Sequence, residues 1–167
     1  MLPHHLAILQ RDLDGLASEI RLYPDDESLW RVVPGCPNAG GNLALHLVGN
    51  LRHFIGAKLG HTSYQRDREA EFSARGASRQ ELLMLVAAAK AEVSATLSAL
   101  DQSALDVMMT LPGPGDRVAT TGIWLMHLVA HLGYHLGQID YHRRTITGDA
   151  AGANMLSVPA LAAGDDG

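Results

Sequence analysis

Three histidines four residues apart stand in the stretch HLVAHLGYHLGQ (127–138): His127, His131 and His135. Residues four apart fall on one face of a helix, so the three imidazoles would lie along one side of it. Two imidazoles with this spacing can chelate one divalent cation. The pattern therefore makes a metal site the chemistry to consider, with hydrogen-bonded core histidines and a pH switch as the alternatives.

His131 and His135 share their helix face with apolar residues. At about 100° per residue, His135 lies roughly 40° from His131 around the helix, and Trp124 lies roughly 20° from it. A buried imidazole without a partner costs about 1–3 kcal/mol, and one shared cation would satisfy both rings. Asp140 falls roughly 140–180° away on the same helix, so the histidine face has no carboxylate to act as a general base.

A useful metal site needs a third ligand from another element. The stretch NLALHLVGNLRH (42–53) offers His46 and His53, and either ring can reach across the core toward the pair. The spacing alone does not choose between them. Asn50, His127 and Gln138 lie near the expected ligand faces, where they would orient a ligand ring, hold a water or contact substrate, or simply pack.

Four amphipathic segments would position these side chains. Apolar residues at steps of three and four predict helices over about 3–23, 42–60, 79–100 and 121–144. One buried stripe on each predicts an all-α fold, a four-helix bundle with long connecting loops, as a single domain over residues 1–146. Residues 147–167 are rich in Gly, Ala and Asp and are expected to form a poorly ordered or extended tail. No strong alternating strand pattern is present.

Capping residues predict the helix ends. Gly40 and Gly41 are expected to break the chain before the second helix, with Asn42 as its N-cap. Ser78 and Glu81 have the spacing of a capping box at the start of the third helix. The cap of the fourth helix is expected at one of the threonines at 120 and 121.

The connection after the second helix carries a run of charges, RDREAEF (66–72), with Arg66, Arg68, Glu69 and Glu71. We expect this run to be solvated or to lie at a dimer contact, in preference to clamping a substrate. His142, near the end of the fourth helix, is expected at the surface.

Composition narrows the function classes. The chain has 167 residues and a formal net charge of −5, so binding to nucleic acid is not expected. No unbroken apolar run reaches the roughly 18 residues of a membrane span, and no secretory signal is evident at the N-terminus. Cys36 is the only cysteine, which excludes an intrachain disulfide and fits a cytoplasmic location.

Two longer stretches, ESLWRVVPGCPNAGGNLALHLVGNLRHF (27–54) and HLVAHLGYHLGQIDYHRR (127–144), resemble the DinB/YfiT-like superfamily of metal-binding four-helix bundles. That family has a histidine early in its second helix and an HxxxH followed by Gly-Gln in its fourth. Here these fall on His46, on His131 and His135, and on Gln138 with the glycine before it. Leu136 stands where the family often has arginine, so any role of that arginine is absent. YQRDREAEF (64–72) resembles one uncharacterised branch of the superfamily.

The resemblance implies a divalent metal, nickel or zinc, on His46, His131 and His135, with open positions for water or substrate. It also implies a homodimer, and its characterised relatives include transferases and isomerases that use low-molecular-weight thiols. The expected function is a metal-dependent enzyme, with thiol-dependent S-transfer to a small electrophile as the leading reaction. Metal-dependent hydrolysis and a non-catalytic, stress-associated metal-binding dimer are the alternatives, and no catalytic residue beyond the ligands is assigned.

Overall fold

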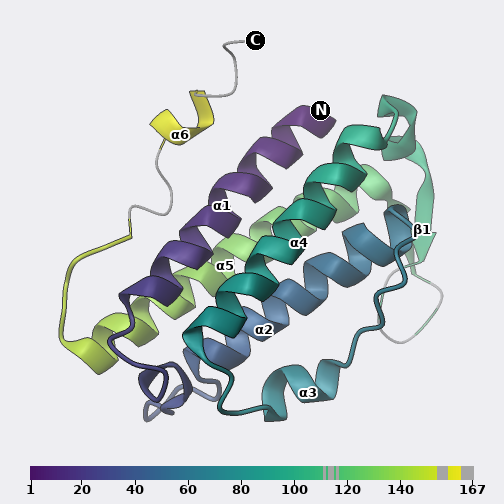
Figure 1. Ribbon diagram of the computed structural model, residues 1–167. Coiled ribbons are helices and arrows are strands. Elements are labelled where there is room, and N and C mark those ends of the chain that lie inside the picture. The colour runs from purple at the N-terminus through teal and green to yellow at the C-terminus, as the bar shows by residue number, and fades with distance from the viewer. Residues whose placement is uncertain (111, 113–114, 116, 154–157, 163–167) are drawn as a thin grey trace.

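The structure is a computed structural model, and it describes residues 1–110, 112, 115, 117–153 and 158–162. Four long helices run side by side (Figure 1). They are α1 (Leu2–Leu22), α2 (Gly40–Leu51), α4 (Arg79–Ala99) and α5 (Thr121–Thr147). Both α1 and α2 pack against α4 and α5, so the four helices close a square around one core. The predicted all-α four-helix fold is confirmed.

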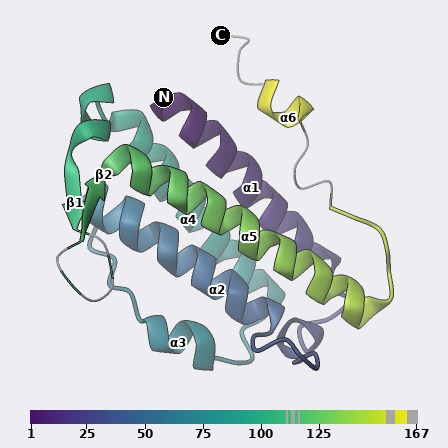
Figure 2. The ribbon, with the colours of Figure 1, turned by 180° about the vertical axis from the view of Figure 1, so that it is seen from behind.

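Shorter elements decorate the bundle. α2 continues without a break into a π-helical segment, and an outer helix lies against α2 (Figure 2). The remaining elements are two short 3₁₀ turns, one antiparallel hairpin and a short helix in the tail. The bounds are η1 (Ser28–Trp30), η2 (Arg52–Leu59), α3 (Arg68–Ser73), η3 (Gln102–Asp106), β1 (Met108–Thr110), β2 (Val118–Thr120) and α6 (Pro159–Ala162).

The sequence patterns did not predict α3 or the hairpin. Strands of three residues are too short for an alternating pattern to be recognised, and α3 is shorter than two helical turns. The predicted tail, 147–167, overlaps the last residue of α5 and includes residues 154–157 and 163–167, which lie outside the described part of the chain.

Two of the predicted helix starts are confirmed, and one is wrong. Ser78 Oγ accepts from the Glu81 N–H, and a Glu81 carboxylate oxygen lies 2.7 Å from Ser78 N, as in a capping box. The Thr120 hydroxyl caps α5. Asn42, however, lies inside α2, which begins at Gly40 with Ala39 as its N-cap. The two glycines do not break the helix.

The reason for those two glycines is close packing against earlier parts of the chain. A Cβ on Gly40 would overlap the hydroxyl of Tyr23, and a Cβ on Gly41 would lie 2.9 Å from the ring of Trp30. The start of α2 can approach α1 and η1 only because these two positions lack side chains.

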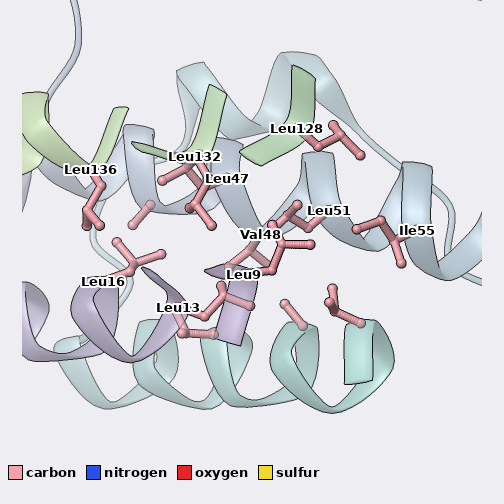
Figure 3. Packing of buried hydrophobic residues seen from close by; sticks show 14 of the residues in the cluster. Leu9, Leu13, Leu16, Leu47, Val48, Leu51, Ile55, Leu128, Leu132 and Leu136 are labelled. Atoms are coloured by element: carbon pink, nitrogen blue, oxygen red, sulfur yellow. The ribbon is translucent and has the colours of Figure 1, made fainter. Parts of the chain in front are cut away.

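The core is built from leucine layers that lock α2 and α5 together with α1. Figure 3 shows the side chains of α1, α2 and α5 meeting at the centre of the bundle. Burying one such leucine stabilises the fold by about 1.5–3 kcal/mol. The residues at this meeting point are Leu9, Leu13, Leu16, Leu47, Val48, Leu51, Leu128, Leu132 and Leu136, each no more than 4% exposed.

Among the described helices, α4 alone is long and apolar enough to cross a membrane by length and composition, with mean hydropathy 1.5 over its best window. Charged residues such as Lys90 and Glu92 interrupt this helix, so it is not an unbroken apolar run. In the bundle, Leu82, Val86 and Val93 of this helix are buried in the shared core. A core helix of a bundle passes the same compositional criterion.

Candidate metal centre

Side chains from α2 and α5 bring three imidazoles together. One ring nitrogen each from His46, His131 and His135 lies within 4.8 Å of the others, and we call these residues the histidine cluster. His46 Nε2 and His131 Nε2 are 3.2 Å apart. Two tetrahedral ligands, each about 2.05 Å from zinc, are separated by about 3.3 Å, so this pair already has ligand spacing. His46 is buried, whereas His131 and His135 are half-buried.

The antiparallel packing of α2 and α5 produces this convergence. His46 faces His131, and eight residues later, in η2, the ring of Phe54 lies 4.8 Å from that of Trp124, seven residues earlier on α5. On α5 the histidines flank the buried leucine stripe, which places them at the edge of the core. His53, the other candidate from the sequence, lies in η2, packs on Phe54 and is not part of the cluster.

A carboxylate from α3 fixes the orientation of His46. Glu71 Oε2 lies 2.9 Å from His46 Nδ1, and Glu71 is only 6% exposed. A carboxylate only accepts, so His46 Nδ1 carries the proton and Nε2 keeps its lone pair toward His131. Arg66 grips the same carboxylate with Nε at 2.7 Å and Nη2 at 2.8 Å. Burial alone raises the pKa of Glu71, but the hydrogen bonds and charge of these two partners outweigh it and lower the pKa.

The chain holds α3 against α2 through two further features. Asn42 Nδ2 lies 3.0–3.1 Å from the backbone carbonyls of Glu71, Phe72 and Ala74. Gly49 faces the Glu71 carboxylate, and a Cβ there would overlap its Oε1. Asn42 is thus an anchor for α3 and not the N-cap that its sequence position indicated.

The expectation that the charge run at 66–72 is a solvated face is therefore wrong for Arg66 and Glu71. Both turn toward α2 and reach the histidine cluster, while Arg68 and Glu69 are exposed. The sequence of the run does not distinguish the residues that face the cluster from the exposed ones, because α3 has no apolar stripe. The one available signal was Gly49, a glycine in the middle of an apolar helix.

Gln138 and His127 lie on either side of the α5 histidines. Gln138 Oε1 is 2.6 Å from His135 Nδ1, so the amide holds the Nδ1 proton of His135 and leaves Nε2 for a ligand. His127 is exposed and stacks on Trp124, with ring centroids 4.7 Å apart. Its centroid is 5.9 Å from that of His131, and His127 is outside the histidine cluster.

Asn50 and Trp124 contribute buried polar atoms on the same side of α2 and α5. Asn50 follows His46 by one turn and is 7% exposed, and Trp124 is 8% exposed. Asn50 Oδ1 and Trp124 Nε1 find no hydrogen-bond partner within the described part of the chain. Buried polar atoms are normally paired, so this acceptor and this donor remain available to a water or a ligand.

The α5 imidazoles of the cluster are neutral at physiological pH. Burial, followed by the nearby His135 and His46, lowers the pKa of His131 to about 4. Burial also lowers the pKa of His135, against the opposing effect of the Gln138 hydrogen bond. Neutral imidazole is the form that binds metals, so these rings need lose no proton to become ligands.

Asp140 and His142 belong to other networks. Asp140 accepts from Arg143 at 3.1 Å and from Arg144 at 2.8 Å, away from the histidines, as its helical position predicted. His142 was expected at the surface, which is wrong: it is 4% exposed. Its Nδ1 is 2.7 Å from Tyr23 Oη and its Nε2 is 2.8 Å from the Arg31 carbonyl, so the ring ties α5 to the chain after α1.

The fold and the site together define an all-α bundle in which two helices supply a three-histidine group able to hold a metal ion. A model of the DinB superfamily matches residues 5–139. The chain therefore belongs to the DinB superfamily, as the sequence resemblance predicted. No curated protein and no solved structure gives a significant match.

Proposed function

We propose that the protein is a metal-dependent enzyme that activates a low-molecular-weight thiol for transfer to a small electrophile, with zinc or nickel on His46, His131 and His135. The observation that carries this is the convergence of three imidazole nitrogens within 4.8 Å. Two of the three rings, those of His131 and His135, are only half-buried. A divalent cation held by neutral imidazoles keeps its full charge and lowers the pKa of a thiol or water that binds it.

The chain's own groups prepare the ligands. Glu71, which Arg66 holds in place, accepts the Nδ1 proton of His46, and Gln138 accepts that of His135, so both Nε2 atoms are available. Such partners fix ring orientation and raise ligand basicity. Asn50 Oδ1 and Trp124 Nε1 supply an acceptor and a donor for the body of a bound molecule.

Thiol transfer is favoured over hydrolysis because Glu71, the carboxylate in contact with the cluster, is already engaged, and Asp140 lies away from the histidines. Hydrolysis is assisted by a general base that takes a proton from the attacking water. Glu71 is held by His46 and Arg66, and Asp140 by Arg143 and Arg144. A thiol that loses its proton to solvent on binding needs no such base, so this site suits thiol chemistry better.

Homodimer formation belongs to the same proposal. The outer face of α5 carries large apolar side chains that are 61–73% exposed, an arrangement typical of an interaction surface. These side chains are Ile123, Met126, Tyr134 and Tyr141. Light scattering of the purified protein would give its mass, and Tyr134→Glu should shift a dimer toward monomer.

Elemental analysis of the purified protein tests the metal first. Activity is then screened with cysteine, cysteamine and glutathione against monobromobimane, which becomes fluorescent when a thiol displaces its bromide. We expect thiol consumption above the uncatalysed rate in the zinc- or nickel-loaded protein, lost after chelation and in His131→Ala. Turnover that persists without metal would refute the mechanism, and metal binding without turnover would leave the non-catalytic alternative.

A further inference from the structure

A second feature lies one helical turn from the histidine cluster, between α2, α5 and the loop at 35–38. It is an open pocket of about 360 Å³, a size within the roughly 300–1,000 Å³ typical of small-molecule sites. On α2, Leu43 lines it three residues before His46, and on α5, Gln138 lines it three residues after His135. Because the two helices are antiparallel, both positions lie on the same side of the histidines, and the pocket is next to the cluster along the helix pair.

The lining of the pocket is uncharged. Its described residues include no Asp, Glu, Lys or Arg, so a charged ligand would leave water without a counter-charge. Leu43 and Pro37 offer apolar surface. Both ring nitrogens of His142 are engaged, by Tyr23 and the Arg31 carbonyl, so that ring offers a ligand van der Waals contact only.

Gln138 connects the pocket to the histidine cluster. Its Oε1 accepts from His135 Nδ1 at 2.6 Å, and no hydrogen bond to another described residue occupies its Nε2. The side-chain amide of Gln138 can therefore bind two groups at once. Its carbonyl oxygen accepts from His135, and its N–H groups are free to donate to an oxygen of a ligand in the pocket.

We propose that this pocket binds a small uncharged molecule with an apolar body and a carbonyl oxygen that accepts from Gln138. Gln138 then couples occupancy of the pocket to the placement of His135. Binding of the neutral molecule stands on the pocket alone, whereas the coupling rests on the proposed metal-dependent function.

The single cysteine gives a direct readout of occupancy, because Cys36 lines the pocket and is exposed. Metal-free, full-length protein is treated with 5,5′-dithiobis(2-nitrobenzoate), and the rate of Cys36 modification is followed with benzamide or benzoate present. These probes differ in charge and scarcely in shape. We expect saturating benzamide to slow modification at least fivefold, and benzoate at the same concentration to change it less than twofold.

Two variants place the effect in the pocket. Thr145→Phe fills the pocket from its lining and should abolish protection by benzamide. Ala91→Phe adds the same ring at an exposed position of α4 and should leave protection intact. Protection by benzoate equal to that by benzamide, or full protection in Thr145→Phe, would overturn the binding proposal.

The coupling is tested by zinc titration with and without saturating benzamide. Linkage requires that each ligand change the affinity for the other by the same factor. We expect a change of threefold or more in the wild type and none in Gln138→Leu; an unchanged zinc affinity in the wild type would overturn the coupling. If zinc does not bind at all, the proposed function fails, while Cys36 protection still decides the pocket.

Discussion

Glu71 Oε2 lies 2.9 Å from His46 Nδ1, so a connecting segment between two bundle helices orients a ring at the histidine cluster. The carboxylate also anchors Arg66, and Asn42 anchors the backbone around it. This segment is therefore part of the site, although it contributes no atom to the ligand group. A change at Glu71, which is not itself in the ligand group, should therefore alter how well the three nitrogens hold a cation.

Glu71→Gln tests that dependence. The amide keeps the shape of the side chain but loses the charge that holds the His46 proton and Arg66. We expect zinc affinity to fall by about 10–100-fold, the usual effect of removing a partner of a metal-ligating histidine. Competition with a chromophoric chelator measures the affinity.

Glu69→Gln is the matched control, since Glu69 is exposed on the same helix. Thermal unfolding of both metal-free variants establishes that they are folded. Equal zinc affinities for Glu71→Gln and Glu69→Gln would show that the contact between Glu71 and His46 does not determine the zinc affinity of the site.

A pair of glycine substitutions tests the close approach of α3. Gly49→Ala would drive a methyl group into Glu71 Oε1, so the carboxylate must move and zinc affinity should fall. Gly133→Ala places its methyl group in open space, with no heavy atom within 4 Å. It should raise the free energy of unfolding by up to about 1 kcal/mol through helix propensity and leave zinc affinity unchanged.

These two results are measured by zinc competition and urea unfolding. A Cβ added at Gly133 or at Gly137 would meet no heavy atom within 4 Å. Tight packing instead occurs at Gly40, Gly41 and Gly49. Unchanged zinc affinity in Gly49→Ala would mean that Glu71 can yield without disturbing His46.

Two alanine substitutions on α5 distinguish a histidine of the cluster from a histidine beside it. His131→Ala removes a nitrogen 3.2 Å from His46 Nε2 and should abolish stoichiometric zinc binding. His127→Ala removes a ring that stacks on Trp124 outside the cluster and should keep stoichiometric binding. Elemental analysis after gel filtration provides the count, and loss of zinc in both variants would point to a different ligand set.

The helices could be predicted from sequence because the core itself sets their pattern. Leucines at steps of three and four must face inward on α1, α2, α4 and α5, and the capping box at Ser78 is a purely local motif. The histidine spacing on α5 likewise placed His131 and His135 on one face. What local pattern could not decide was the partner helix, since His46 and His53 both pointed toward the core.

Long-range polar contacts were beyond prediction for a different reason. Glu71, Arg66 and His142 sit among charged or polar neighbours, and only the fold brings each to its partner. His142 reaches Tyr23 across 119 residues of chain, and Glu71 reaches His46 across 25. A single buried polar contact of this kind produces no repeating pattern in the sequence, because it involves one side chain and not a whole helix face.

The buried imidazole of His142 makes stability depend on pH. Burial lowers its pKa below the ordinary value of 6.5, although the Arg31 carbonyl acts in the opposite direction. In the unfolded chain the ring protonates near 6.5, so below that pH the unfolded state binds more protons than the native state. The free energy of unfolding should therefore fall as pH drops below about 6.5, by at most about 1.4 kcal/mol per pH unit for this ring. Above that range the ring contributes no pH dependence.

His142→Gln lacks the titration, so its stability should change less between pH 7.5 and 5.5 than that of the wild type. Urea unfolding of both proteins in a metal chelator measures the difference and cancels the titration of the histidine cluster. Parallel pH profiles would mean that His142 is protonated as readily in the native protein as in the unfolded chain.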